Sequence, residues 1–370
     1  MSLYKKNILF IVIFTLCAFV SAPVFVWIVD PFHIYHRDTW LNKNKIGRSA
    51  NYSLQNGGEL ECACLNGEID GVICGGCVSN GVNTSDFKRS VQGEKRFIHF
   101  CTTGIYVNSI HLEMLQETFR RQDVKHVVLL NPPIVLSTML LEEADLFYNP
   151  KRILFEKAGF FSAVAVVLSH FRLKTSRTPE STHLWQPEDP KEFFFKHAMK
   201  SRNKGAISSV IIDDKFQNTT DNPLLQLIAE HPEITFHLLF FPQWSLNDEN
   251  VVEMNLKDTS FYIESTKTFQ NVKIYDFHDV PHTVIATNWG DSVHFFSPMF
   301  CKFMAYCIEH DLHRVNAENY ETYKQHIIDV LKAFDFLNYP DRTTTFEELV
   351  AYEESLHPEL KKQKVAVEKP

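Results

Sequence analysis

Four of the eight cysteines stand in two short motifs, Cys62-x-Cys64 and Cys74-x-x-Cys77. Cysteine pairs at such spacings can bind zinc, form disulfides or act as nucleophiles. The short segment between the motifs disfavours a zinc site, and a Cys62–Cys64 bridge would be strained. Cys74-Gly75-Gly76-Cys77 also has the spacing of a redox pair. The sequence therefore leaves three roles open for Cys77: nucleophile, disulfide partner of Cys74, or structural thiol.

An acidic and a basic residue stand late in the chain at the spacing Asp291-x-x-His294. An imidazole can take the proton of a thiol, and a carboxylate can orient that imidazole. The alternative is structural, with Asp291 as a helix cap and His294 on the surface before the helix expected to begin at Ser297. Ser79, two residues after Cys77, is an alternative nucleophile.

The elements that must position these residues follow from the hydrophobic pattern. Buried strands are predicted at 71–74, 96–101, 126–130, 236–241 and 272–275, with helices at 108–120, 223–230, from 297 onward and from 316 to about 336. Strands that alternate with helices indicate an α/β fold with a parallel sheet covered on both faces. Such sheets bind ligands beyond the carboxyl ends of their strands.

Three predicted strand ends carry residues that could do chemistry. Gly75-Gly76-Cys77 follows the first strand, Gly104 follows the second, and Asn131 follows the third. A thiol at a strand-to-helix turn would be exposed, and the helix N-terminus would favour its thiolate form. We therefore expect these residues to lie together at one edge of the sheet.

The N-terminus predicts a membrane anchor over residues 1–30. Lys5 and Lys6 precede an uncharged stretch over 8–29, which is long enough to cross a bilayer and is followed by Asp30. A cleaved signal peptide is the alternative, although Pro23 would follow the cleavage site directly. Either way, we expect the later residues to face an oxidising space, where disulfides can form.

Length and composition are those of a globular protein. The chain has 370 residues, of which 45% are hydrophobic and 22% charged, which excludes a disordered chain. The net charge of −8 argues against a general nucleic-acid binder. We expect one α/β domain over 31–340, with an aromatic helical insertion at about 150–200, and a helical or flexible tail over 341–370.

The order of these motifs resembles the SGNH, or GDSL-type, hydrolase superfamily. More narrowly, the chain resembles membrane-anchored SGNH-like proteins of bacterial envelope and exopolysaccharide systems. The segments that carry this likeness are Asp30-Pro31-Phe32, Ile73-Cys74-Gly75-Gly76-Cys77, Phe240-Phe241-Pro242-Gln243 and Asp291 to Pro298. They span most of residues 24–310.

The resemblance implies a three-layer α/β/α fold of flavodoxin type, with a mainly parallel five-stranded sheet after one transmembrane helix. It implies Cys77 as the nucleophile in place of the family's serine, His294 as the base and Asp291 as its orienting acid. The oxyanion donors would be the backbone N–H groups of Cys77 and Gly104, with the Asn131 side chain as a third. No cofactor or metal is implied.

Three functions follow as hypotheses. The first is an acyl-ester hydrolase or O-acyltransferase that acts outside the cytoplasmic membrane on an envelope or exported polysaccharide. Its partners would be an acylated glycan or acyl donor and, by resemblance, a membrane-bound O-acyltransferase. The second is a binding or assembly factor that has lost catalysis, suggested by the cysteine in place of serine. The third is a thiol–disulfide protein that uses Cys74 and Cys77.

Overall fold

The chain forms two compact units. The computed structural model describes residues 20–30, 34–35, 52–67, 69–102, 106–136, 147–155, 159–161, 163–164, 167, 222–241, 249–284, 297–333 and 344–360. The first unit comprises residues 1–68 and 140–183, and the second comprises residues 69–139 and 184–370. This division groups residues 31–68 and 140–183 with the N-terminal segment, whereas the sequence suggested one domain over 31–340.

The second unit is built on a mostly parallel six-stranded sheet. Its strands are β1 (Ile69–Gly75), β2 (Arg96–Cys101), β3 (His126–Leu130), β4 (Thr235–Phe240), β5 (Val272–Asp276) and β6 (Arg314–Val315). The order is β2-β1-β3-β4-β5-β6, with every pair parallel except β5–β6. The α/β prediction is confirmed, but the expected five strands are corrected to six. A two-residue strand is too short to leave a periodic pattern in the sequence.

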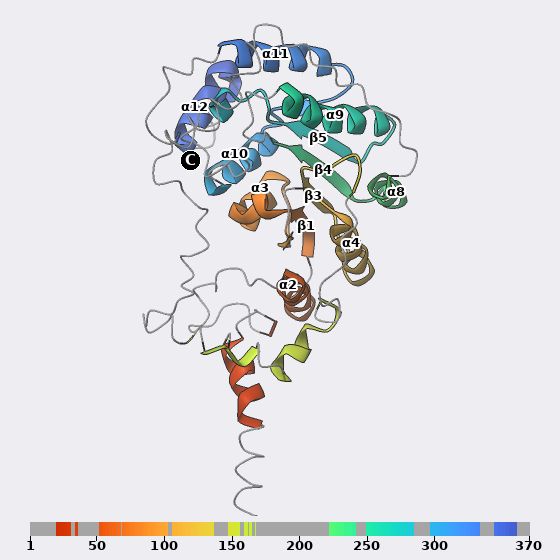
Figure 1. Ribbon diagram of the computed structural model, residues 1–370, viewed down its shortest axis with the longest axis vertical. Helices are drawn as coiled ribbons and strands as arrows, with labels where there is room; N and C mark the ends of the chain where they lie inside the picture. The colour runs from red at the N-terminus through yellow and green to blue at the C-terminus, as the bar shows by residue number, and fades with distance from the viewer. Residues whose placement is uncertain are drawn as a thin grey trace, which may run out of the picture. The chain divides into compact units, whose positions relative to one another are not determined.

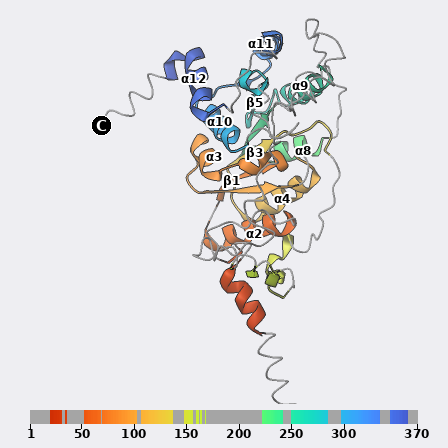
Figure 2. The same cartoon turned by 60° about the vertical axis from the view of Figure 1, so that its left-hand side comes forward.

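Helices cover both faces of this sheet, which explains why most residues of β1 to β4 are buried. Figures 1 and 2 show α3, α10 and α12 on one side and α4, α8 and α9 on the other. β2 lies on one side of β1 in the sheet, whereas β3, β4 and β5 lie on its other side. Right-handed crossover connections that run in opposite directions along a sheet place their helices on opposite faces. The bounds of the helices are α3 Thr84–Ser90, α4 Ser109–Arg121, α8 Pro223–Glu230, α9 Glu249–Ser265, α10 Ser297–Glu309, α11 Tyr320–Ala333 and α12 Phe346–Leu356.

Helix starts follow local capping chemistry. The Asn222 side chain accepts hydrogen bonds from the N–H groups at the start of α8, and Pro223 occupies the first turn of this helix, which has the predicted bounds. The helix predicted from residue 316 begins later. The Asn316 side chain accepts from the N–H groups of Glu318 and Asn319, and α11 begins only at Tyr320.

A row of four rings crosses the sheet through Phe97, His126, His237 and Tyr275. Successive centroids lie 6.2, 5.8 and 6.3 Å apart. The Phe97 ring reaches over β1 at Gly71, where a Cβ atom would lie 2.0 Å from it. Both ring nitrogens of His237 are buried and have no hydrogen-bond partner. Burial, followed by nearby positive charges, lowers the pKa of His237 to about 3.

Replacing His237 by leucine should therefore make the protein more resistant to acid. A buried neutral histidine with a lowered pKa loses stability as the pH falls below its unfolded value near 6.5, by about 1.4 kcal/mol per pH unit, until the folded pKa is reached. Urea unfolding at about pH 6.5 and about pH 5 should show a drop roughly 2 kcal/mol smaller in His237→Leu than in wild type. His326→Leu, at an exposed position, is the matched control. Equal drops in His237→Leu and wild type would show that His237 is not buried as described.

The first unit contains a helix over residues 20–29, α2 (Tyr52–Asn66) and the 3-10 helix η2 (Pro150–Phe155). Asp30 ends the first helix, and its two carboxylate oxygens accept the N–H groups of Ile34 and Tyr35 at 2.9 and 2.7 Å. In the described part of the chain, no helix combines the length and apolar character needed to span a bilayer. Residues 1–19 of the expected anchor lie outside the described residues.

Candidate active site

The thiol of Cys77 stands immediately beyond the carboxyl end of β1. β1 ends at Gly75, Gly76 follows with extended backbone, and Cys77 opens the 3-10 helix η1 (Cys77–Gly81). Cys77 is partly exposed, whereas Cys74 and Cys101 are buried. Gly75 is needed for this tight turn, because a Cβ atom there would lie 2.7 Å from the Cβ of Ser79. The strand end therefore presents an accessible thiol at the edge where parallel sheets bind ligands.

The helix that follows Cys77 differs from the expected one. η1 is a five-residue 3-10 helix, and the α-helix α3 begins only at Thr84. The field of a helix N-terminus fades within its first turn. The dipole of an α-helix therefore does not act directly on the Cys77 thiol, contrary to what the strand-to-helix pattern suggested.

Cys74 is fully buried in β1, as its place in the predicted strand implied. Burial raises the pKa of this thiol well above its usual value. Neither Cys74 nor Cys77 forms a disulfide in the structure. Thiol–disulfide exchange begins with attack by an accessible thiolate, so Cys74 is not suited to be the attacking thiol of a redox pair. Within the described ranges, no group of three or more His, Cys, Asp or Glu side chains is placed to hold a metal ion.

Ser79, the alternative nucleophile, is completely buried beneath the turn. Its hydroxyl donates to the Gly76 carbonyl at 2.7 Å and lies 2.8 Å from Nε2 of His99 on β2. This Ser–His contact joins η1 to the neighbouring strand. Because the hydroxyl is enclosed and already donates to Gly76, the pair supports the turn and is not placed to attack a substrate.

A second histidine, which was not predicted from the sequence, holds the end of β1 in place before Cys77. His111 on α4 is fully buried, and its Nε2 lies 3.1 Å from the Gly75 carbonyl. Its Nδ1 accepts the backbone N–H of Asn108 at 3.1 Å, and the Asn108 amide donates to Thr102 at 3.0 Å. Burial lowers the pKa of His111 to about 4, although the bond to Gly75 opposes this shift. A neutral His111 thus donates to the last carbonyl of β1.

Asn131 follows β3, as predicted, and it links the ends of two strands. Its backbone φ is 52°, a left-handed conformation that asparagine tolerates. Its side-chain oxygen accepts the Phe241 N–H at 2.9 Å, and its side-chain nitrogen lies 3.5 Å from the Phe241 carbonyl. The amide that the resemblance assigns to the oxyanion is therefore already bonded to the end of β4.

Removing this amide should lower stability. Asn131→Gly keeps the left-handed backbone accessible but leaves the buried Phe241 N–H without its acceptor, at a cost of about 1–3 kcal/mol. Asn131→Asp preserves an acceptor and is the matched control. Urea denaturation measures both variants. An unchanged free energy of unfolding in Asn131→Gly would show that the hydrogen bond to Phe241 does not stabilise the protein. The Asn131 amide would then be available for catalysis.

The loop after β3 is held in place by α8 and α9. The Ile134 N–H donates to Asp258 at 2.9 Å, and the Tyr262 hydroxyl donates to the Pro133 carbonyl at 3.0 Å. Asn222 also donates to the Ile134 carbonyl at 2.8 Å. Burial raises the pKa of Asp258 to about 7, despite its bond to Ile134. The carboxyl edge of the sheet is thus fixed beside Asn131.

A buried Asp–His pair, which the sequence did not single out, lies at the carboxyl end of β5. Asp276 Oδ1 lies 2.5 Å from Nδ1 of His278, and the Asp276 carboxylate also accepts from Thr259 and Tyr323. Burial alone would raise the pKa of Asp276, but His278 and the two hydroxyl donors outweigh burial and lower it. Nε2 of His278 is buried without a hydrogen-bond partner. The signal available in the sequence was Asp276-x-His278 directly after a predicted strand.

The remaining predicted site residues are Gly104, Asp291 and His294, and all three lie outside the described residues. The structure thus places Cys77 and Asn131 at the carboxyl ends of their strands and tests neither the Asp291–His294 dyad nor the Gly104 donor.

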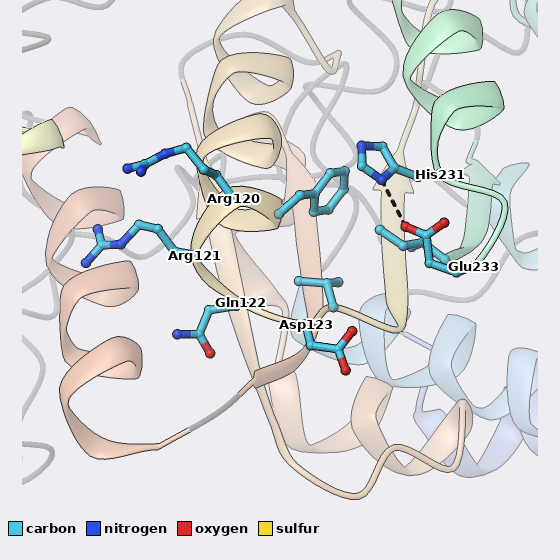
Figure 3. Close-up of a pocket in the computed structure, with 9 residues that line it drawn as sticks. Arg120, Arg121, Gln122, Asp123, His231 and Glu233 are labelled. Atoms are coloured by element: carbon cyan, nitrogen blue, oxygen red, sulfur yellow. Dashed lines mark hydrogen bonds and ion pairs between the residues drawn. The ribbon is translucent and has the colours of Figure 1, made fainter.

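A surface hollow at the other end of the sheet does not coincide with this site. It is lined by the end of α4 and by the residues that precede β3 and β4. Figure 3 shows its charged side chains, with the His231–Glu233 contact of 3.0 Å marked. Asp123 pairs in the same way with Lys125 at 2.7 Å. The charges around this hollow are therefore largely matched by neighbours.

Comparison with known proteins gives no further assignment: no protein-family model, curated protein or solved structure matches this chain. The arrangement around Cys77 must accordingly be interpreted from its own geometry.

Proposed function

We propose that the protein is an acyl-ester hydrolase or O-acyltransferase that acts on an envelope or exported polysaccharide. Cys77 is the nucleophile, His294 the base and Asp291 the acid that orients it. The catalytic domain faces the extracytoplasmic side of a bacterial cytoplasmic membrane, to which residues 1–30 anchor it in a single pass. The main observation that supports the proposal is the packing of α10 against η1.

α10 packs against both η1 and α3, and Figures 1 and 2 both show α10 beside α3. The last residue of α10, Glu309, pairs with Arg89 near the end of α3 at 3.4 Å. α3 runs from the carboxyl edge of the sheet back to the start of β2, so its end marks the amino edge. The start of α10, at Ser297, therefore points to the carboxyl edge where Cys77 lies.

His294 precedes Ser297 by three residues. Three residues span at most about 10 Å. A base at His294 is thus tethered to the helix that packs against the nucleophile's own turn, and Asp291 comes one short step earlier. This tether supports a Cys–His–Asp arrangement in which His294 is the base and Asp291 orients it.

The proposed reaction proceeds in two steps. His294 takes the Cys77 proton, and the thiolate attacks the ester carbonyl to give a tetrahedral oxyanion held by backbone N–H groups. Collapse releases the alcohol, which takes the proton from His294, and leaves an acyl thioester on Cys77. Water or a sugar hydroxyl then gives its proton to His294 and attacks the thioester, which releases an acid or a new ester and restores the thiol.

Ester turnover tests the proposal. Full-length protein in detergent is given 4-nitrophenyl acetate with and without a bacterial polysaccharide, and both nitrophenol and acetylated glycan are measured. Release above buffer that depends on Cys77 is expected, and acetylated glycan in addition would identify a transferase. No release and no transfer by the folded protein would contradict the catalytic assignment.

A non-catalytic role in polysaccharide export is the second candidate. The observation that favours it is the commitment of the Asn131 amide to Phe241, which leaves the proposed oxyanion site dependent on backbone donors. This function predicts that the folded protein binds the polysaccharide in a sedimentation assay while Cys77→Ala binds equally well. Loss of turnover together with retained binding in Cys77→Ala would instead favour the enzyme.

A further inference from the structure

Two segments of the first unit, far apart in the sequence, pack against each other. Val26 and Val29 of the helix over 20–29 form a small buried cluster with Ala163. Phe25 from the same helix and Phe160 lie beside it, with ring centroids 5.8 Å apart. Phe160 and Ala163 therefore pack against the last turns of the helix over 20–29.

The remaining faces of these two segments expose large apolar side chains. Phe155 and Phe161 are 80% and 68% exposed, and Trp27 and Ile28 are 45% and 48% exposed. Val20 and Val24 are also exposed. Because the two segments pack together, we define these six residues with Phe160 as one apolar surface. Soluble proteins rarely leave so many large apolar groups together in water, so this surface indicates an apolar partner.

The sequence that precedes this surface identifies the partner as a bilayer. Residues 8–19 lead directly into the helix over 20–29 without a charged residue, and Lys5 and Lys6 stand before them. Tryptophan and phenylalanine beside such a stretch are typical of the boundary between lipid headgroups and acyl chains. A bilayer is favoured over a second protein because the helix over 20–29 continues in the sequence an uncharged stretch whose length and composition suit lipid.

We propose that the apolar surface enters this boundary, so that Phe155, Phe160 and Phe161 form a second membrane contact beside the N-terminal segment. The inference rests on the membrane anchor of the proposed function and adds a contact that the anchor alone does not require. A single span leaves the first unit free to rotate relative to the membrane surface. Two contacts from separate parts of the chain would restrict the orientation of this unit.

Photocrosslinking in liposomes tests this contact. Full-length protein with p-benzoylphenylalanine in place of Phe155 or Phe161 is reconstituted in phosphatidylethanolamine and phosphatidylglycerol vesicles and irradiated. Lipid adducts are counted by mass spectrometry. The matched control carries the same group in place of Leu356, which is exposed at the end of α12. Several times more lipid adduct at positions 155 and 161 than at position 356 is expected.

The outcomes separate the inference from the anchor on which it rests. Protein that fails to float with vesicles after an alkaline carbonate wash contradicts the anchor itself. Protein that floats but yields no more lipid adduct at 155 and 161 than at 356 overturns the second contact alone. Adducts at 155 and 161 that join two copies of the chain would assign the apolar surface to self-association and would likewise overturn it.

Discussion

Cys77→Ala is expected to lower the rate of acyl release by the protein, measured above the buffer rate, about a thousandfold or more. Removal of the nucleophile of a triad leaves only the contribution of binding and of the oxyanion donors. The rate of nitrophenol release measures the loss. Cys64 is the other partly exposed cysteine among those described, so Cys64→Ala is the matched control and should keep the wild-type rate.

Cys77→Ser separates nucleophilic chemistry from simple loss of the thiol. A hydroxyl at the same turn keeps the backbone donors but depends on the base far more than a thiol does. We expect Cys77→Ser to react more slowly than wild type and measurably faster than Cys77→Ala. A Cys77→Ala protein with the wild-type rate would remove Cys77 from the mechanism, whatever the serine variant does.

The second large effect concerns the stability of the domain and centres on His313. This buried histidine lies in the turn between α10 and β6, with Nδ1 2.7 Å from Asp279 and Nε2 3.0 Å from Glu353 on α12. Burial would lower the pKa of His313, but Asp279, Cys307 and Glu353 together raise it well above its usual value. One imidazolium thus joins three separate parts of the second unit.

His313→Asn should lower the free energy of unfolding by about 3–5 kcal/mol, because it leaves the buried carboxylate of Glu353 and the partly buried carboxylate of Asp279 without their cation. Asparagine tolerates the φ of 55° at this position, so backbone strain does not confuse the result. Urea unfolding provides the measurement. Glu347→Gln, at the exposed start of α12, is the control for a lost surface carboxylate and should change stability little.

The pH dependence of this effect has a defined sign. The folded pKa of His313 is raised, so its contribution is fully present below the unfolded value near 6.5 and is lost as the pH rises through the folded value. The difference between wild type and His313→Asn should therefore shrink at alkaline pH. A difference that grows with pH, or is absent throughout, would contradict the ion pairs at His313.

The sequence predicted the elements whose signals are local. β2, β3 and α8 match the expected ranges because their buried apolar runs end at clear polar or proline residues. α9 was missed because its polar and apolar residues are weakly separated between the two faces of the helix. Lys257, Asp258 and Thr259 stand beside buried Leu256 and Phe261 in the sequence. α2 was missed because Gly57 and Gly58 interrupt its pattern. Gly57 is required there by a close approach, since a Cβ atom would lie 2.4 Å from the Phe147 carbonyl.

The candidate site was predictable only where a residue follows a strand. Cys77 and Asn131 were found because parallel strands end at one edge, so any polar residue after a strand becomes a candidate. The contacts of Asn131 with Phe241 and of His111 with Gly75 join residues 110 and 36 positions apart. No spacing rule reveals such contacts. The burial of Ser79 likewise depends on how η1 folds against β2.

A covalent acyl group on Cys77 tests the central claim most directly. Full-length protein is mixed briefly with 4-nitrophenyl acetate, quenched in acid, and its intact mass and peptides are measured. The account predicts an added acetyl group on the peptide that contains Cys77, absent from Cys77→Ala and longer-lived in His294→Ala. A folded protein that carries no acetyl group on Cys77, or whose Cys77 is joined to Cys74 in a reducible disulfide, would contradict the claim.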